Sequence, residues 1–270
     1  MSAVTEFADI PLNSDDDVAC NDARRLYTDL LAQNLDWTSL NKTQADQIKS
    51  IVKTFRAGAK KDHALSQHSL AVVCSAGHGI RQDVTEAHKL WLKASQQGLV
   101  KSMESLAQLL YTGRKSVKQD FTQAAKWWIV AAEAGSARSQ HNLGSLYQNG
   151  QGVLKDRTAA VAWFQRSANQ GFPEAQFALA QYHEHGVGGM PKSRAKALEL
   201  YSLAAAKDFP QAQQHLERLS AKAESDATQV TAEMGTGGNG RRKSIVVAAS
   251  IPDVYSPSAS SLANEGGVLL

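Results

Sequence analysis

A pattern that returns every 36 or 37 residues dominates this sequence. A small residue followed four positions later by leucine occurs at Ser66/Leu70, Ser102/Leu106, Ser139/Leu143, Ala175/Leu179 and Ala212/Leu216. A column of two bulky residues keeps the same step, at Leu90-Trp91, Trp127-Trp128, Trp163-Phe164 and Leu200-Tyr201. Such a period is typical of repeat proteins, in which each unit buries its apolar face against its neighbours. The chain is therefore expected to be an array of stacked units.

Each unit predicts two helices joined by a turn. Within residues 137–171, Ser139 and Leu143 lie on one helical stripe because they are four positions apart. Gly150 then interrupts the pattern, and Asp156 suits the first position of a second helix because its carboxylate can accept from free backbone N–H groups. Each unit is therefore predicted to be a helical hairpin.

The ends of the units carry residues that tolerate a left-handed backbone. These are Gly98, Gly135, Gly171 and finally Asp208, where aspartate replaces glycine. Proline at positions 173 and 210 marks the starts of two first helices, since the first turn of a helix does not need the missing N–H.

The predicted fold class is all-α, an α/α superhelix or solenoid of about four and a half helical-hairpin repeats. Residues 61–224 form the solenoid, and residues 20–60 form an N-terminal helical cap or, as the alternative, an independent functional helix pair. The cap helices are predicted from two apolar stripes, Leu26, Leu30 and Leu31 in one and Ile48, Ile51, Val52 and Phe55 in the other. The acidic residues 1–19 and the tail 225–270 are expected to be disordered, because they cannot bury enough apolar surface.

Charge and cysteine content narrow the possible functions. The chain has 29 Lys and Arg against 26 Asp and Glu, scattered among one another, so no nucleic-acid partner is expected. Two cysteines cannot build a disulfide framework, which favours a reducing compartment. With no signal-peptide pattern and no run of about 18 apolar residues, we expect a cytoplasmic protein without a membrane span.

Several columns resemble a known family. Residues 139–171 read small-Gln-x-x-Leu-Gly-x-x-Tyr, Gly-x-Gly-Val, Asp-x-x-x-Ala and Trp-Phe-x-Arg-Ser-Ala-x-x-Gly, a pattern that resembles the Sel1-like repeat family. The resemblance covers about 155 of the 270 residues, with departures such as Cys74 in place of the tyrosine and Ser193 in place of the aspartate. The related tetratricopeptide repeats have a shorter period, about 34 residues.

The resemblance implies a protein–protein interaction adaptor or scaffold, without catalytic residues, cofactor or metal. The alternative is a regulatory subunit that activates a partner enzyme, as proteins resembling this family do in fungal wall synthesis. In that case phosphorylation of the C-terminal tail would be the switch. Ser244 follows Arg241-Arg242-Lys243, which resembles the substrate motif of a basophilic protein kinase, and Ser256-Pro257 is a proline-directed candidate.

Other chemical patterns have structural explanations. Cys74 and His78 are a nucleophile and a base four residues apart, but Cys74 occupies a core column of the repeat. His183-Glu184-His185 lacks the two-turn spacing of a zinc helix. Trp127-Trp128 falls in the core column of a second helix, so packing explains it better than base stacking.

The concave face of the solenoid is the predicted binding surface. The side chains opposite each core leucine belong to the residues five and two positions before it and two positions after it. They are expected to bind an extended peptide of a partner, with Phe177 as an exposed apolar anchor. The alternative is a solvated face without a ligand. The candidate residues are Lys101, Glu104, Gln108, Arg138, His141, Ser145, Glu174, Phe177 and Gln181.

Overall fold

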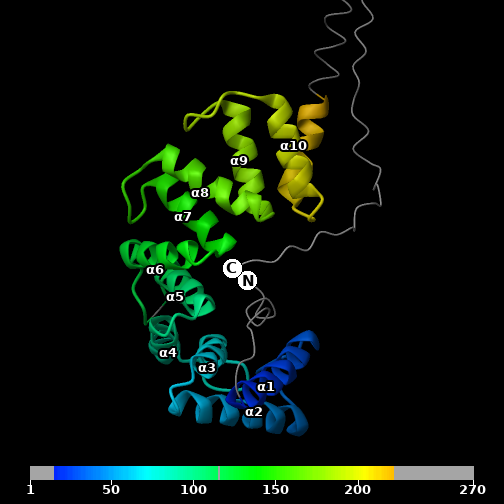
Figure 1. The fold of residues 1–270 in the computed structure, drawn as a ribbon. Coiled ribbons are helices and arrows are strands. Elements are labelled where there is room, and N and C mark those ends of the chain that lie inside the picture. The colour runs from blue at the N-terminus through cyan, green and yellow to red at the C-terminus, as the bar shows by residue number, and fades with distance from the viewer. Residues whose placement is uncertain (1–14, 115, 222–270) are drawn as a thin grey trace, which may run out of the picture. The chain divides into compact units, whose positions relative to one another are not determined.

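The computed structural model describes residues 15–114 and 116–221 (Figure 1). Apart from one isolated β-bridge between Arg114 and Val117, the regular structure of these residues is helical. The helices are α1 (Asp15–Ala32), α2 (Lys42–Lys60), α3 (Ala64–Ala76), α4 (Val84–Gln96), α5 (Val100–Thr112), α6 (Phe121–Glu133), α7 (Ala137–Asn149), α8 (Arg157–Asn169), α9 (Pro173–His185) and α10 (Arg194–Ala205). A further helical segment covers residues 210–221. Ser244 and Ser256 lie outside the described residues.

The helices pair as the repeat pattern predicted. Four hairpins, α3/α4, α5/α6, α7/α8 and α9/α10, follow one another, and each helix packs mainly against the next one in the chain. Residues 210–221 supply a half unit after α10. The all-α repeat solenoid is thus confirmed.

Polar side chains start the second helix of every hairpin. Asp83, Asp120 and Asp156 each accept a hydrogen bond from the backbone N–H of the second or third helical residue. Ser193 does the same with its hydroxyl for Lys196, so the departure from aspartate in the last hairpin preserves the cap. After the last second helix, Asp208 has a positive φ of 57°. Glycines with positive φ occupy the same position in the other units.

The repeated columns form the core. The small residue of each unit is at most 1% exposed, and Leu106, Leu143 and Leu179 are equally buried. In the bulky pairs the second residue is always buried, whereas Trp127 and Trp163 are half-buried. Trp127 packs against the adjacent core cluster, as the packing interpretation predicted.

Buried glutamines link consecutive units. Gln140, in α7, donates through Nε2 to the carbonyl oxygen of Ala132 in the preceding hairpin, at 3.1 Å. Gln176 occupies the same column one unit later and donates to the Ala168 carbonyl at 3.5 Å. These bonds recur with the repeat, so they fix the register of one hairpin against the next.

Two loop glycines allow hairpins to approach closely. Gly152 lies against the carbonyl group of Phe121, the first residue of the second helix in the preceding unit. Gly188 lies in the same way against Arg157, where an added Cβ would be 2.9 Å from the carbonyl oxygen. A side chain at either position would press on backbone atoms of the neighbouring unit.

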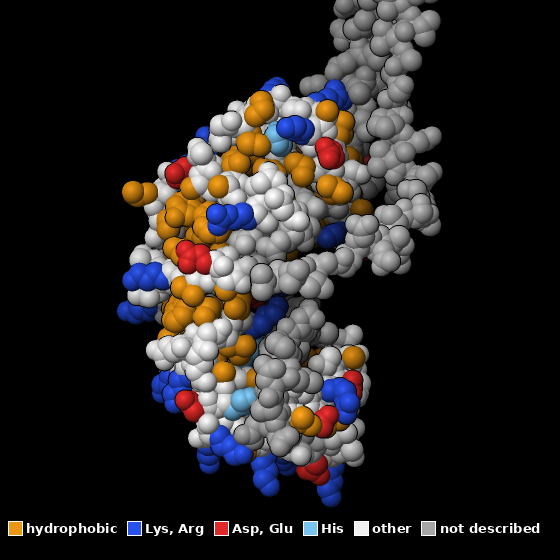
Figure 2. All heavy atoms as spheres, viewed as in Figure 1, with side chains coloured by type: hydrophobic (Ala, Val, Ile, Leu, Met, Phe, Trp, Pro, Cys, Tyr) orange, Lys and Arg blue, Asp and Glu red, His pale blue; other side chains and the backbone are white. Residues whose placement is uncertain are grey.

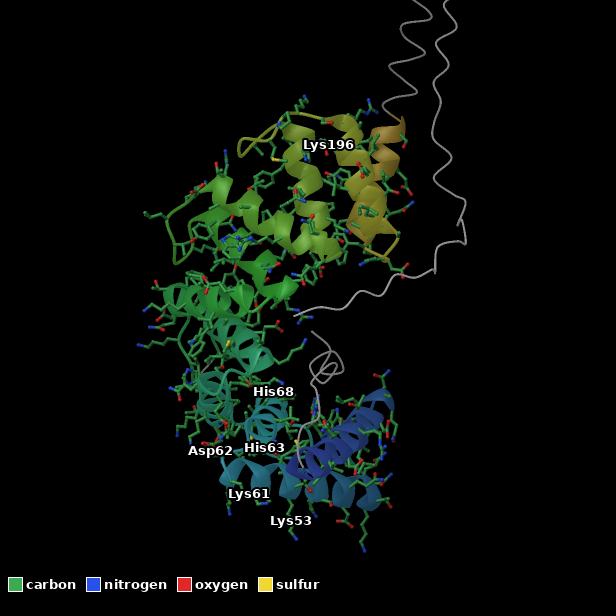
Figure 3. The ribbon with its side chains drawn as sticks, in the orientation of Figure 1. Lys53, Lys61, Asp62, His63, His68 and Lys196 are labelled. Carbon is green, nitrogen blue, oxygen red and sulfur yellow. The ribbon has the colours of Figure 1, made fainter. Side chains whose placement is uncertain are left out.

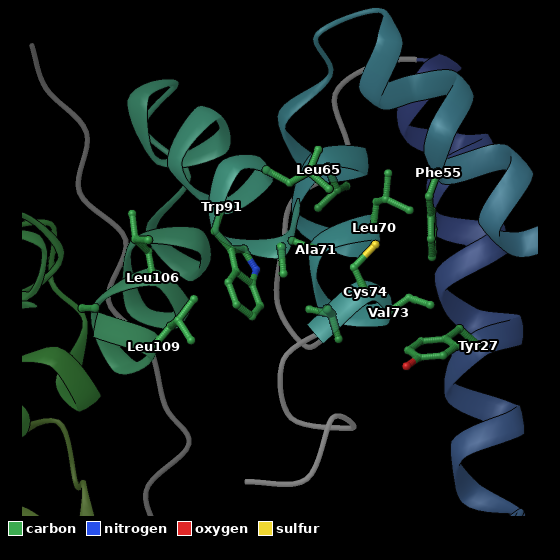
Figure 4. Packing of buried hydrophobic residues seen from close by; sticks show 14 of the residues in the cluster. Tyr27, Phe55, Leu65, Leu70, Ala71, Val73, Cys74, Trp91, Leu106 and Leu109 are labelled. Atoms are coloured by element: carbon green, nitrogen blue, oxygen red, sulfur yellow. The ribbon is translucent and has the colours of Figure 1, made fainter. Parts of the chain in front are cut away.

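Helices α1 and α2 cover the free side of the first hairpin. Tyr27 and Phe55 are fully buried, and both belong to the core cluster that includes Val73 and Cys74 of α3 (Figure 4). Leu26, which the apolar stripe placed toward the core, is instead 49% exposed. The buried face of α1 runs through Cys20, Ala23, Tyr27 and Leu30.

Helix α1 also begins earlier than expected. Its first residue is Asp15, inside the segment that the sequence assigned to a disordered terminus.

Candidate functional site

A pocket of about 520 Å³ lies among the first helices of the first three hairpins, α3, α5 and α7. Lys101, Glu104 and Gln108 of α5 line it together with Arg138 of α7. Four of the nine predicted surface residues, from two consecutive hairpins, therefore meet at one concavity. This placement follows from the repeat, because equivalent helix faces are presented side by side.

Helix α3 contributes lining residues that the sequence interpretation omitted. His68 and Val72 lie two before and two after Leu70, the same positions that identified Glu104 and Gln108. Applying the rule to the first unit would have found both. His68 lies close to α5, with its Nδ1 2.9 Å from the Ser102 Oγ (Figure 3).

The pocket is lined by both apolar and polar residues. Val72, Trp91 and Leu109 provide apolar surface. Most of the remaining lining is polar, namely His68, Ser75, His78, Gln82, Lys101, Glu104, Ser105, Gln108, Thr112, Arg114, Arg138 and Asn142. Peptide-binding surfaces commonly have this composition, since apolar contacts give affinity and the rim supplies hydrogen bonds.

Positive charge prevails in the pocket. Lys101, Arg114 and Arg138 line it, whereas Glu104 is its one carboxylate. Glu104 is engaged within the protein: it accepts from the Ser136 hydroxyl of the next hairpin and lies 3.9 Å from the Lys101 Nζ. Burial lowers the pKa of His78, so this imidazole is neutral at neutral pH. An anionic or carbonyl-rich ligand is therefore the better electrostatic match.

Phe177 does not have the exposed position that the sequence suggested. Its ring is half-buried and lies 5.4 Å from Tyr201, 5.3 Å from Phe209 and 5.1 Å from His215, measured between ring centroids. The ring is therefore less exposed than expected, and its role as an apolar anchor stays a prediction. The reason is that the half unit after α10 covers this end of α9.

The other predicted residues lie outside the pocket. His141 contacts the rings of Phe164 and Phe172, and burial lowers its pKa to about 4. Ser145 donates through its hydroxyl to the His141 carbonyl. Glu174 and Gln181 are half-buried on α9. These residues remain candidates for a longer binding surface, but the pocket does not bring them together.

The residues considered for catalysis or metal binding have structural roles. Cys74 is 5% exposed, and burial raises the pKa of its thiol to about 11, which opposes a nucleophilic role. His78 stacks on Trp37 at 4.3 Å between ring centroids, and its Nδ1 is 2.6 Å from the Tyr27 hydroxyl. Glu184 accepts from Tyr201 and Arg218. Within residues 15–114 and 116–221, no three His, Cys, Asp or Glu side chains form a group suited to a metal ion.

The visible surface carries mixed charge. Lys and Arg side chains are scattered among Asp and Glu in Figure 2, without a continuous basic stripe on that face. This distribution does not favour a nucleic-acid ligand. No helix in the described part of the chain is long and apolar enough to cross a membrane.

The chain is similar to two fungal regulators over part of its length. It is 25% identical over 165 residues to chitin synthase regulatory factor 3 of Schizosaccharomyces pombe, covering 59% of this chain and 18% of that protein. It is 33% identical over 108 residues to the chitin synthase regulator SKT5 of Saccharomyces cerevisiae, covering 39% of this chain and 16% of that protein. The chain thus spans less than a fifth of either relative.

Structural similarity and the repeat pattern agree. A Sel1 repeat protein from Oxalobacter formigenes has a solved structure that matches with a TM-score of 0.61 and 25% identity, covering 79% of this chain and 91% of that one. The model of the Sel1 repeat matches residues 64–99, 100–136, 137–172 and 173–218. Because these four units make up more than half of the 270 residues, the chain belongs to the Sel1 repeat family.

Proposed function

We propose that this protein is an interaction adaptor that binds an extended segment of a partner protein in the pocket formed by α3, α5 and α7. The observation that carries the proposal is the convergence of Lys101, Glu104, Gln108 and Arg138 with His68 around one concavity. A rigid stack of hairpins holds these side chains in place before a ligand arrives, which limits the entropy lost on binding.

The lining favours a peptide over a small apolar molecule. Small-molecule sites are mostly apolar with few polar groups, whereas hydrogen-bonding side chains predominate here. Amide groups such as those of Gln108 and Asn142 can pair with the N–H and C=O groups of an extended backbone. Val72, Trp91 and Leu109 can then receive one apolar side chain of the partner. We assign no reaction to the pocket.

The proposal is tested by reversing charge in the pocket. Lys101→Glu combined with Arg138→Glu should reduce partner capture at least tenfold when tagged full-length proteins are incubated with lysate of the source organism. The control is Lys89→Glu with Lys126→Glu, which changes the same charge on exposed residues of the second helices α4 and α6. Capture of the same partners by both variants at wild-type levels, with unchanged circular dichroism, would contradict the assignment of the pocket.

A second candidate function is regulation of an enzyme, supported by the two relatives described as chitin synthase regulators. The partner would then be a synthase, and phosphorylation of Ser244 by a basophilic kinase, or of Ser256 by a proline-directed kinase, would modulate the interaction. Phosphate would add about −1.5 to −2 charge next to Arg241-Arg242-Lys243.

Regulation is tested with fungal membranes that contain chitin synthase. Purified protein should raise polymer synthesis, and the Lys101→Glu/Arg138→Glu variant should fail to do so. Ser244→Ala tests the kinase site separately, because it should abolish labelling by a basophilic kinase without altering the pocket. Unchanged synthesis at saturating protein would exclude this second function.

A further inference from the structure

We propose that the N-terminal segment of this chain, residues 1–14, is an intramolecular ligand of the pocket formed by α3, α5 and α7. The segment would then compete with the partner, so the binding site regulates itself. This inference rests on the proposed function, because the competition has a consequence only if the pocket receives a partner peptide.

Charge complementarity is the first argument. The pocket is lined by Lys101, Arg114 and Arg138 and by one carboxylate, Glu104, which accepts from Ser136 and lies 3.9 Å from the Lys101 Nζ. Three cations against one carboxylate leave an excess of two positive charges. Residues 1–14 contain two acids, Glu6 and Asp9, and no Lys or Arg. Charges of opposite sign attract one another over about 10 Å at 0.1 M salt, which is the Debye length. The cations of the pocket therefore favour this acidic segment as a ligand.

The order of residues in the segment is the second argument. Glu6-Phe7 and Asp9-Ile10 each place an acid beside an apolar residue. The pocket contains both kinds of complement, the cations Lys101, Arg114 and Arg138 and the apolar residues Val72, Trp91 and Leu109.

The attachment point is the third argument. The segment leads into α1, and the Tyr27 hydroxyl of α1 lies 2.6 Å from the Nδ1 of His78, which lines the pocket. Asp15 is about 18 Å from Tyr27 along the helix axis, at a rise of about 1.5 Å per residue. An extended chain of 14 residues spans at most about 46 to 50 Å, which is enough to return to the pocket. A tether of this length gives an effective concentration in the millimolar range.

Paramagnetic relaxation in the full-length protein tests the inference. A nitroxide is attached to Ala3→Cys; Cys20 and Cys74 are 1% and 5% exposed, so the wild-type protein treated with the same reagent is the labelling blank. The amide signals of Gln108 and Asn142, at the pocket, should broaden at least twofold more than those of Lys126 and Arg166, exposed on second helices. Added salt should reduce the difference.

The charge requirement is tested with matched variants. Glu6→Gln with Asp9→Asn should abolish the selective broadening, whereas Glu133→Gln with Glu199→Gln, which removes two exposed acids elsewhere, should preserve it. Broadening that is absent, or equal at the pocket and the reference residues, overturns the inference. Broadening that survives neutralisation of Glu6 and Asp9 overturns it as well, because attraction by the cations is then not the cause.

A capture assay separates this inference from the proposed function. The Glu6→Gln/Asp9→Asn protein should retain several-fold more partner than the wild type, since the competitor is weakened. If Lys101→Glu/Arg138→Glu loses the partner but the nitroxide shows no docking, the pocket binds a partner and self-competition is wrong. If docking is seen while that variant keeps every partner, the proposed function is wrong and the segment alone occupies the pocket.

Discussion

Replacing Gly152 by alanine should weaken the junction between the second and third hairpins. The backbone at Gly152 has φ of 69°, and a Cβ at this position would overlap the carbonyl carbon and oxygen of Phe121. Gly135 offers a matched control, because its φ is 94° but no heavy atom lies within 4 Å of the Cβ position. The two substitutions therefore share backbone strain and differ in steric overlap.

The expected magnitudes follow from these two contributions. A left-handed backbone costs an L-residue about 1 to 2 kcal/mol, which is the whole effect expected for Gly135→Ala. Overpacking against atoms that cannot move aside adds about 1 to 3 kcal/mol at Gly152. Gly152→Ala should therefore lower the free energy of unfolding by about 2 to 5 kcal/mol.

Urea denaturation followed by circular dichroism measures the difference. Because each hairpin contacts only its neighbours, the weakened junction should also broaden or split the transition of Gly152→Ala. The m-value reports this loss of cooperativity independently of the midpoint. Equal destabilisation by both substitutions, with equal m-values, would refute the steric role of the contact with Phe121.

Three further predictions concern the core, the helix caps and a buried histidine. Leu143→Ala should cost about 2 to 5 kcal/mol in urea denaturation because Leu143 is fully buried, whereas Ser145→Ala should be nearly neutral. Asp156→Ala should cost about 0.5 to 2 kcal/mol by loss of the helix cap, and Asp156→Ser should restore most of it, as Ser193 caps α10. His141 has a pKa of about 4 in the folded state, below its unfolded value of about 6.5, so the unfolded state takes up the proton first. Stability should therefore fall as pH drops from about 6.5 to about 4. His141→Gln should show a smaller fall between urea midpoints at pH 7 and pH 5.

Local signals made most of the fold predictable. The stripe of small residues and leucines, the aspartates that begin second helices and the residues that end units all act within one or two helical turns. Even Ser193 and Asp208, which depart from the pattern, serve the same local purpose as the residues they replace. The sequence thus identified the hairpins without knowledge of their packing.

The candidate site was less predictable, because it depends on which neighbour covers each helix. The spacing rule selected Lys101 and Arg138, which line the pocket, but it also selected Phe177, which the terminal half unit covers. His68 escaped notice because the rule was not extended to the first hairpin. Contacts between units decide which side chains of a first helix stay exposed, and the repeat pattern of a sequence does not specify these contacts directly.

The links between hairpins also determine how this molecule can change in length. Gln140 and Gln176 bind main-chain carbonyls, and Gly152 and Gly188 lie against main-chain atoms of the residue that starts a second helix. A neighbouring unit therefore needs no particular side chain at these points. If recombination removed residues 137–172, Gln176 would find the Ala132 carbonyl and Gly188 would find Phe121, which are the partners that Gln140 and Gly152 have now. Whole units are in this sense interchangeable, whereas loss of a single residue would shift the junction contacts of the unit that contains it.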